Sequence, residues 1–221
     1  MTRATTLPRP LTRARTGYGV RHGLRDVLGN EAWQRLPAAV RERFAENASN
    51  ATYAGGFEIV RASVLGRLFA WAGALFGTPV APRVGHDIEA RVLVRPNDAG
   101  VRWDREYHWH DGATHLVRST KVITEDGLMI EKLPARLCMP LRVYEEGGVL
   151  HFVSRGYFFD LGFGGLALKL WLPRFFSPGV THVEHIDLDH GWFRFTMTVT
   201  HPQLGEIFYQ TGRFCAAEET P

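Results

Sequence analysis

The chain has 221 residues, of which 45% are hydrophobic and 22% are charged. This length and composition predict one β-rich domain over 22–221 with a sizeable core, preceded by a disordered basic arm over 1–21. The formal net charge is +3, but the arm contributes five arginines and no acidic residue, so the remainder carries 21 basic and 23 acidic groups. A nucleic-acid-binding surface on the folded body is therefore not expected.

The arm does not resemble a targeting segment. It lacks the apolar run of a secretory signal, and Pro8 and Pro10 break the amphipathic helix of a transit peptide. Cys138 and Cys215 are the only cysteines, which suits a reducing compartment with two ordinary buried thiols. We expect a cytoplasmic protein.

Two helical regions are predicted. The stretch 24–46 predicts two short helices divided by Pro37, and 63–76 predicts a longer helix that begins after Ser63 and ends at Gly77. One side of the longer helix is bulky and the other is small, with Ser63, Gly66, Ala70, Gly73 and Gly77 spaced so that another backbone can approach closely. We expect this helix to be buried against a sheet. The alternative is contact with a membrane surface or a partner helix.

Most of the remaining chain has the period-two alternation of β-strands. Strands are predicted over 52–60, 88–95, 101–110, 115–124, 128–133, 141–145, 149–158, 180–188, 192–200 and 206–214. Gly55 and Gly56 predict a bend or bulge in the first of them. Short turns and the absence of an alternating βαβ pattern predict an α+β, mainly β fold. We expect a large curved antiparallel sheet or partly open barrel with the N-terminal helices packed on it.

The stretch 148–178 combines an aromatic strand, a glycine break and a leucine-rich segment. Such a segment suits a lid over an apolar cavity, although Leu161–Phe176 also alternates as a core strand does, and both alternatives stay open. The candidate ligand-binding residues are Arg155 and Tyr157 as polar anchors, with Phe159, Phe163, Trp171 and Phe175 as apolar lining.

Two histidine patterns are candidates for metal or acid/base sites. His108 and His110 share a strand face but lack the following glutamate of cupin-like metal sites, so a solvated outer face is expected. His182 and Glu184 share one face, while His185 falls on the other. We expect a surface position for this pair, with an acid/base dyad as the alternative. No metal or cofactor is expected, and no catalytic residue is identified.

The arrangement resembles a known family, the bacterial domains of unknown function 4166. The matching stretches are LPAAVRERF in the helical segment, Gly55–Phe76, WDREY at Trp103–Tyr107, GGVLHFVSRGY at Gly147–Tyr157, and GWFRFTMTVTHPQLGEIFYQTG at Gly191–Gly212. The resemblance covers 23–214 and implies no activity for any residue. It implies a companion reductase-like nucleotide-binding domain, which this chain lacks, so such a partner would act in trans.

Three functions follow from these observations. We expect the chain to bind a hydrophobic small molecule, such as a lipid or polyketide-like metabolite, in a cavity of the curved sheet. The first alternative is a cofactor-independent enzyme, such as a cyclase or isomerase, that uses the same cavity. The second is an auxiliary or membrane-surface domain working with a separate reductase.

Overall fold

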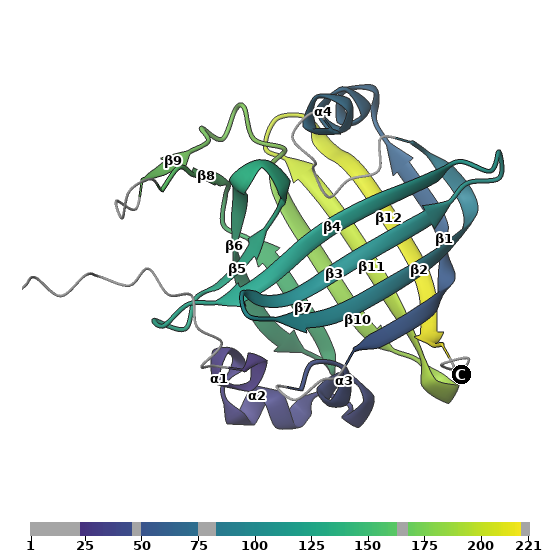
Figure 1. The fold of residues 1–221 in the computed structure, drawn as a ribbon, viewed down its shortest axis with the longest axis vertical. Coiled ribbons are helices and arrows are strands. Elements are labelled where there is room, and N and C mark those ends of the chain that lie inside the picture. Colours follow the sequence, from purple (N-terminus) through teal and green to yellow (C-terminus); the bar gives the residue numbers. More distant parts are fainter. Residues whose placement is uncertain (1–22, 46–49, 75–82, 163–167, 218–221) are drawn as a thin grey trace, which may run out of the picture.

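The computed structural model describes residues 23–45, 50–74, 83–162 and 168–217, in which one continuous β-sheet carries short helices at its two ends (Figure 1). The strands are β1 (Ala51–Ala62), β2 (Gly85–Asn97), β3 (Gly100–His108), β4 (Thr114–Ile123), β5 (Met129–Lys132), β6 (Leu137–Glu146), β7 (Val149–Ser154), β8 (Phe158–Asp160), β9 (Lys169–Trp171), β10 (Val180–Asp187), β11 (Trp192–His201) and β12 (Gly205–Ala216). The helices are α1 (Leu24–Leu28), α2 (Asn30–Arg35), α3 (Ala38–Arg43) and α4 (Val64–Ala74). The mainly β class predicted above is confirmed.

The sheet closes into an antiparallel barrel. Neighbouring strands follow the order β5-β4-β3-β2-β1-β12-β11-β10-β7-β6, and β5 also pairs with β6. In that closing pair, Met129 lies opposite Leu141 and Lys132 lies opposite Cys138. The expectation of a partly open sheet was therefore wrong, because β5 has hydrogen-bonded neighbours on both sides. The short strands β8 and β9 extend the sheet outward from β6.

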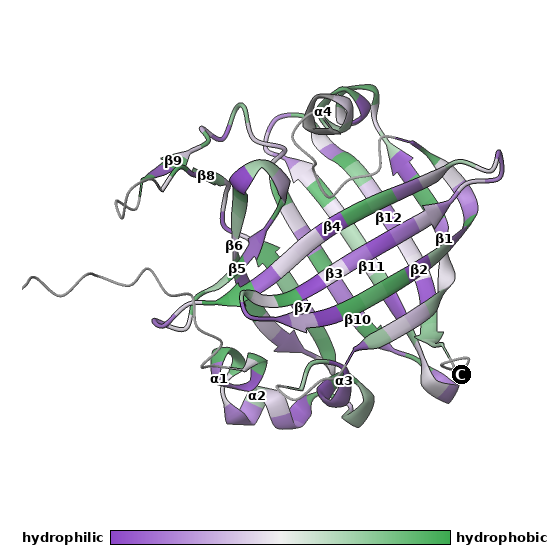
Figure 2. Cartoon of the chain, in the orientation of Figure 1, coloured by the Kyte–Doolittle hydropathy of each residue, from purple (hydrophilic) through white to green (hydrophobic). Residues whose placement is uncertain are grey.

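Side chains alternate between the inside and the outside of the barrel, as the period-two pattern predicts. On β11, for example, Phe193, Phe195, Met197 and Val199 are buried, whereas Arg194, Thr196 and Thr198 are only partly so. Figure 2 shows the same alternation of apolar and polar residues along the strands. The buried residues form a large aromatic cluster and a second cluster that includes the N-terminal helices.

Glycines let three strands approach closely at the middle of β1. A Cβ atom on Gly55 would lie 2.0 Å from the Arg213 carbonyl oxygen of β12, and one on Gly212 would lie 2.4 Å from the Gly56 oxygen. The register with β12 shifts between Phe57 and Ile59, whereas the register with β2 is the same on both sides of this point. The irregularity lies in the strand where a bend or bulge was predicted, but after Phe57 rather than at Gly55 and Gly56.

The N-terminal helices cover one end of the barrel, and α4 lies at the other end (Figure 1). Three short helices replace the two that were predicted before Glu46, because Gly29 separates α1 from α2 with a φ of 81°. Val40 and Leu36 from this region are fully buried in the second cluster. These helices thus close the barrel end rather than lying on an open sheet.

Helix α4 is capped as predicted, because the Ser63 hydroxyl accepts a hydrogen bond from the Gly66 amide at 3.0 Å. Its small side faces the barrel, where Gly66 and Ala70 are buried. The bulky residues Val64, Leu68 and Trp71 are 73%, 59% and 65% exposed. Phe69 is partly buried and packs against the aromatic cluster, so one bulky residue of α4 also contributes to the packing. The predicted end at Gly77 lies outside the described residues.

The predicted strand 149–158 is interrupted. Strand β7 ends at Ser154, and the chain turns at Gly156, whose φ of 117° is readily adopted only by glycine. Within the following segment, β9 and the residues around it are exposed, so the core-strand alternative for 161–176 was wrong. The lid alternative stays a prediction, and residues 163–167 lie outside the described part.

Cys138 and Cys215 are both free thiols. Among the described residues, no helix has the length and apolar character that crossing a membrane requires.

Candidate functional site

Four polar side chains point into the barrel from adjacent strands: Arg105 on β3, Ser119 and Lys121 on β4, and Glu131 on β5. Lys121 lies directly opposite Glu131 in the antiparallel pairing. The side chains of Arg105, Lys121 and Glu131 are at most 10% exposed. Each lies at an inward-facing position of its strand. The barrel interior therefore holds polar and charged groups at positions that usually carry apolar side chains.

These groups are bonded to one another. The Lys121 ammonium donates a hydrogen bond to Glu131 Oε1 at 3.2 Å, and Arg105 Nη2 lies 3.9 Å from the same oxygen. Arg105 Nη1 also donates to the Ser119 hydroxyl at 3.3 Å. Two cations thus share one carboxylate, and the charge that remains uncompensated inside the barrel is positive.

Burial and charge together set the protonation of this pair. Burial alone would raise the pKa of Glu131, but the attraction of Lys121 and Arg105 outweighs it and holds this pKa below its ordinary value. Burial lowers the pKa of Lys121 despite the neighbouring Glu131, and the positive charge of Arg105 lowers it further. Glu131 is therefore ionised, and Lys121 gives up its proton more readily than a surface lysine does.

An apolar cavity of about 90 Å³ adjoins Lys121 at the end of the barrel covered by α1 and α3. Its lining combines aromatic and aliphatic side chains with two cations: Leu24, Arg43, Phe44, Val94, Val101, Trp103, Lys121, Ile123, Met129 and Phe152. The Lys121 ammonium lies 5.2 Å from the centre of the Trp103 ring and 5.5 Å from that of Phe152. The lining of the cavity is thus apolar on most sides and positively charged on the side of Lys121.

Arg43 brings a second positive charge to this cavity from the end of α3. Its guanidinium lies 3.7 Å from the centre of the Phe193 ring, yet the buried nitrogen Nη1 has no hydrogen-bond partner in the described part of the chain. One oxygen of the nearby Asp187 carboxylate is likewise buried without a partner. An unpaired guanidinium nitrogen beside a cavity is a donor available to a ligand oxygen.

His185 lies among aromatic rings deeper in the same region. Its ring centre is 5.0 Å from that of Phe44 and 5.4 Å from that of Phe195. Burial, followed by the positive charges of Arg43, Lys121 and Arg105, holds the pKa of His185 well below its ordinary value. This imidazole is therefore neutral, and its buried Nδ1 has no described partner.

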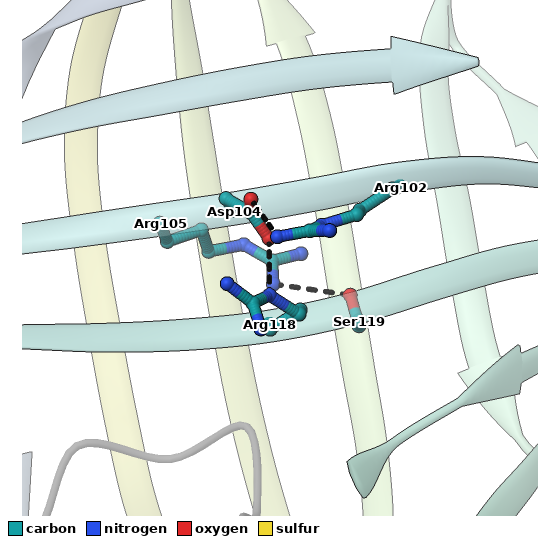
Figure 3. Close-up of polar contacts among 5 residues, drawn as sticks. All are labelled: Arg102, Asp104, Arg105, Arg118 and Ser119. Carbon is teal, nitrogen blue, oxygen red and sulfur yellow. Dashed lines mark hydrogen bonds and ion pairs between the residues drawn. The ribbon is translucent and has the colours of Figure 1, made fainter. Parts of the chain in front are cut away.

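The outer face of the same strands carries a separate ion-pair network (Figure 3). Arg102 donates two hydrogen bonds to the Asp104 carboxylate at 2.9 and 2.7 Å, and Arg118 donates a third at 3.0 Å. Burial would raise the pKa of Asp104, but these bonds outweigh it and lower the pKa. Asp104 and Arg105 thus lie on opposite faces of β3. Asp104 forms ion pairs on the outside of the barrel, and Arg105 places a positive charge inside it.

A larger depression of about 630 Å³ lies at the bulge of β1. Its charged lining is mainly acidic, with Glu58, Asp87, Glu89 and Asp189, and Arg213 is paired with Glu58. All four carboxylate residues are at least partly exposed. Because the buried unpaired groups lie inside the barrel instead, we place the candidate site there.

The residues predicted to bind a ligand are distributed over different surroundings. Tyr157 is buried and forms a 2.7 Å hydrogen bond with the Thr181 hydroxyl, beside a cavity of about 40 Å³ under α4. Arg155 lines a depression of about 500 Å³ outside the barrel. Phe159 is half-buried, whereas Trp171 and Phe175 are exposed. Phe163 lies outside the described residues.

The interior charges belong to no sequence motif, and they are recognised only as charged residues at inward positions of the strands. Arg105 interrupts the apolar alternation of Val101, Trp103, Tyr107 and Trp109, and this interruption is the signal that was available. Lys121 and Glu131 occupy comparable positions in their strands. A charged residue in the apolar phase of a strand indicates a buried polar group.

The chain was compared with known proteins at three levels. No curated protein matches it, and no solved structure matches it either. Residues 36–214 match the family described as Domain of unknown function (DUF4166). This match spans most of the barrel together with the end of the N-terminal helical region, and the chain therefore belongs to the DUF4166 family.

Proposed function

We propose that the chain binds a hydrophobic monocarboxylic acid inside its barrel, with the carboxylate beside Lys121 and Arg43. The observation that carries this proposal is the charge around the cavity. The region contains three cations, Arg43, Arg105 and Lys121, and two carboxylates, Glu131 and Asp187. These five side chains leave one net positive charge in a largely buried region. A single carboxylate neutralises it.

The shape of the cavity supports a chain-like ligand. Its volume of about 90 Å³ holds a head group and a few carbons, well below the roughly 300 Å³ of a pocket that encloses a whole drug-sized ligand. Leu24, Phe44 and Val101 line it, so it lies between the N-terminal helices and the rim of the barrel. We propose that the remainder of the aliphatic tail passes out between these elements.

Octanoate is a suitable probe, and octanol of the same length is its neutral control. Trp103 lines the cavity, so binding should change tryptophan fluorescence, and calorimetry should give the affinity. We expect octanoate to bind at least about tenfold more tightly than octanol, since a hydrogen bond to a charged group contributes about 1.5 to 3 kcal/mol. Equal affinities, or no octanoate binding at millimolar concentration, would contradict the proposal.

Variants test the anchor. Lys121→Met alone leaves Glu131 buried and unpaired, so the double variant Lys121→Met/Glu131→Gln is used to keep the pair uncharged. The variant keeps the net charge of the region but removes the ammonium donor beside the cavity, so we expect it to fold and to lose at least about tenfold in octanoate affinity. The matched control Lys169→Met removes an exposed lysine on β9 and should bind as the unaltered chain does. If the folded double variant binds octanoate with unchanged affinity, the placement of the ligand carboxylate beside Lys121 is wrong.

A second candidate function, contact with an anionic membrane surface, rests on a separate observation. Val64, Leu68 and Trp71 of α4 are exposed at one barrel end, and the 161–176 segment exposes Leu170, Trp171, Phe175 and Phe176. The cations in these two stretches are Arg67, Lys169 and Arg174, and neither stretch contains an acidic residue. Apolar side chains interspersed with cations suit the interface of an anionic bilayer.

Liposome flotation tests this second candidate. We expect flotation with vesicles containing phosphatidylserine, and its loss in Leu68→Glu/Trp71→Glu. The control Thr196→Glu places a charge on the outer face of β11, away from both stretches. Failure of the unaltered chain to float with anionic vesicles would exclude the membrane function without affecting the interior site.

A further inference from the structure

Three metal-ligating side chains converge on the outer wall of the barrel, on strands β7 and β10. His151 of β7 lies directly opposite Glu184 of β10 in the antiparallel pairing, and His182 precedes Glu184 by two residues. All three side chains therefore leave the sheet on the same face. This face is the outside, because Leu150 and Phe152, the residues flanking His151, are buried in the barrel core.

The three donor atoms form a compact triangle. His151 Nδ1 lies 3.0 Å from His182 Nε2 and 3.6 Å from Glu184 Oε1, and His182 Nε2 lies 3.9 Å from that oxygen. A point equidistant from three corners with these separations lies about 2.1 Å from each, which is the usual length of a bond from zinc to imidazole nitrogen or carboxylate oxygen. That point lies in the plane of the three donors, and tetrahedral bonds of the same length need donor separations of about 3.4 Å, so small side-chain movements would form a zinc site here.

Hydrogen bonding accounts for only part of this geometry. The two imidazoles lie within hydrogen-bond distance of each other, but both separations to the carboxylate oxygen exceed the 2.7 to 3.2 Å expected of an N–H···O bond. The oxygen thus approaches both nitrogens without being hydrogen-bonded to either. The two longer separations are those of ion pairs, and all three donor atoms lie within 4.8 Å of one another, as the ligands of one cation do.

The site is also held in place before any ion arrives. The Tyr144 ring stacks on His151 at 4.7 Å with an interplanar angle of 12°. His151 is buried, whereas His182 and Glu184 are about one-third exposed, so the triangle has one fixed wall and one side open to solvent.

We propose that His151, His182 and Glu184 bind a divalent transition-metal ion of the zinc class. Two imidazoles and one carboxylate favour such an ion over Mg²⁺ or Ca²⁺, which prefer oxygen ligands. Three protein ligands leave a position on the exposed side for water or another small ligand, as in catalytic rather than structural zinc sites. This site replaces the surface pair His182/Glu184 of the sequence analysis by a triad, whose third member comes from a neighbouring strand.

Zinc titration of the full chain tests the proposal. We expect one Zn²⁺ per chain with a dissociation constant of about 1 μM or below, measured by calorimetry and by equilibrium dialysis with elemental analysis. His182→Ala and Glu184→Gln should each weaken binding by at least about tenfold. Both residues are partly exposed, so these variants should fold, and circular dichroism verifies it. The control His110→Ala removes an exposed histidine from another part of the barrel and should leave the affinity unchanged.

Cobalt gives a second readout that is specific to coordination. Co²⁺ in the site should show visible d–d absorption with nitrogen and oxygen ligands, and His151→Ala should abolish it. Zinc binding with unchanged affinity in both His182→Ala and Glu184→Gln would overturn the proposal, as would a dissociation constant above about 100 μM for the unaltered chain. Octanoate affinity should be the same in His182→Ala as in the unaltered chain, because the two sites lie on opposite faces of the barrel wall.

Discussion

At the scale of single residues, His185 has the most unusual surroundings in the barrel. It is 3% exposed, and Arg43, Lys121 and Arg105 add positive charge to the effect of burial. Its pKa is therefore far lower in the folded state than in the unfolded chain, where it is near 6.5. Below pH 6.5 the unfolded state binds a proton that the folded state does not, so stability must fall as the pH falls through this region.

The change His185→Phe should remove this dependence. We expect the unaltered chain to lose stability by up to about 1.4 kcal/mol per pH unit as the pH is lowered below 6.5, until the lower folded-state pKa is reached. The variant should show a flatter profile between pH 7 and 5, measured as the urea midpoint at each pH. His110→Gln, an exposed control, should keep the original slope. Parallel profiles for His185→Phe and the unaltered chain would contradict this account.

The same residues show where sequence reasoning stopped. Alternation along β3 correctly placed Trp103 and Tyr107 on the face opposite Asp104, and the structure confirms it. It also places Arg105 on the inner face, although nothing in a single strand tells which partners would neutralise that charge. The carboxylate that neutralises it, Glu131, and the hydroxyl that accepts its hydrogen bond, Ser119, come from two other strands.

At the scale of elements, α4 depends on one close contact. A Cβ atom on Gly66 would lie 1.8 Å from the Ile207 carbonyl oxygen of β12, and that oxygen also accepts the Ser63 amide at 3.0 Å. The helix can therefore lie against the strand only with glycine at this position. The small-residue spacing indicated such an approach, but the sequence did not identify the strand concerned.

The change Gly66→Ala should lower the free energy of unfolding by about 1 to 3 kcal/mol, because the helix or the strand must shift to admit the methyl group. The higher helix propensity of alanine, about 1 kcal/mol, offsets part of this loss. The control Leu68→Ala removes a larger but exposed side chain and should cost less than about 0.5 kcal/mol. Urea denaturation distinguishes the two, and a Gly66→Ala chain as stable as the unaltered one would show that α4 packs differently.

At the scale of the whole molecule, closure of the barrel depends on β5. This strand has only the residues Met129–Lys132, yet it pairs with β4 on one side and β6 on the other. In an open sheet it would be an edge strand with unpaired backbone groups. Closure removes that edge and joins the first and second halves of the chain.

Native-state hydrogen exchange should detect this closure. We expect amide protons of β5 to exchange as slowly as those at the centre of β4, since both strands are bonded on two sides and buried. The exposed strand β9, which pairs only with β8, should exchange much faster and serves as the internal control. Rapid exchange along β5 at rates close to those of β9 would indicate an open sheet.

The sequence by itself determined most of the strands, the mainly β class, the capped helix and the family, because alternation, turn residues and caps act between residues near in the chain. The tertiary structure decided the closure of the barrel, the buried charges around Lys121 and the triangle of His151, His182 and Glu184. Each of these depends on register between strands that are far apart in sequence. A strand's own pattern tells which face a side chain occupies, but only pairing tells which side chains share that face.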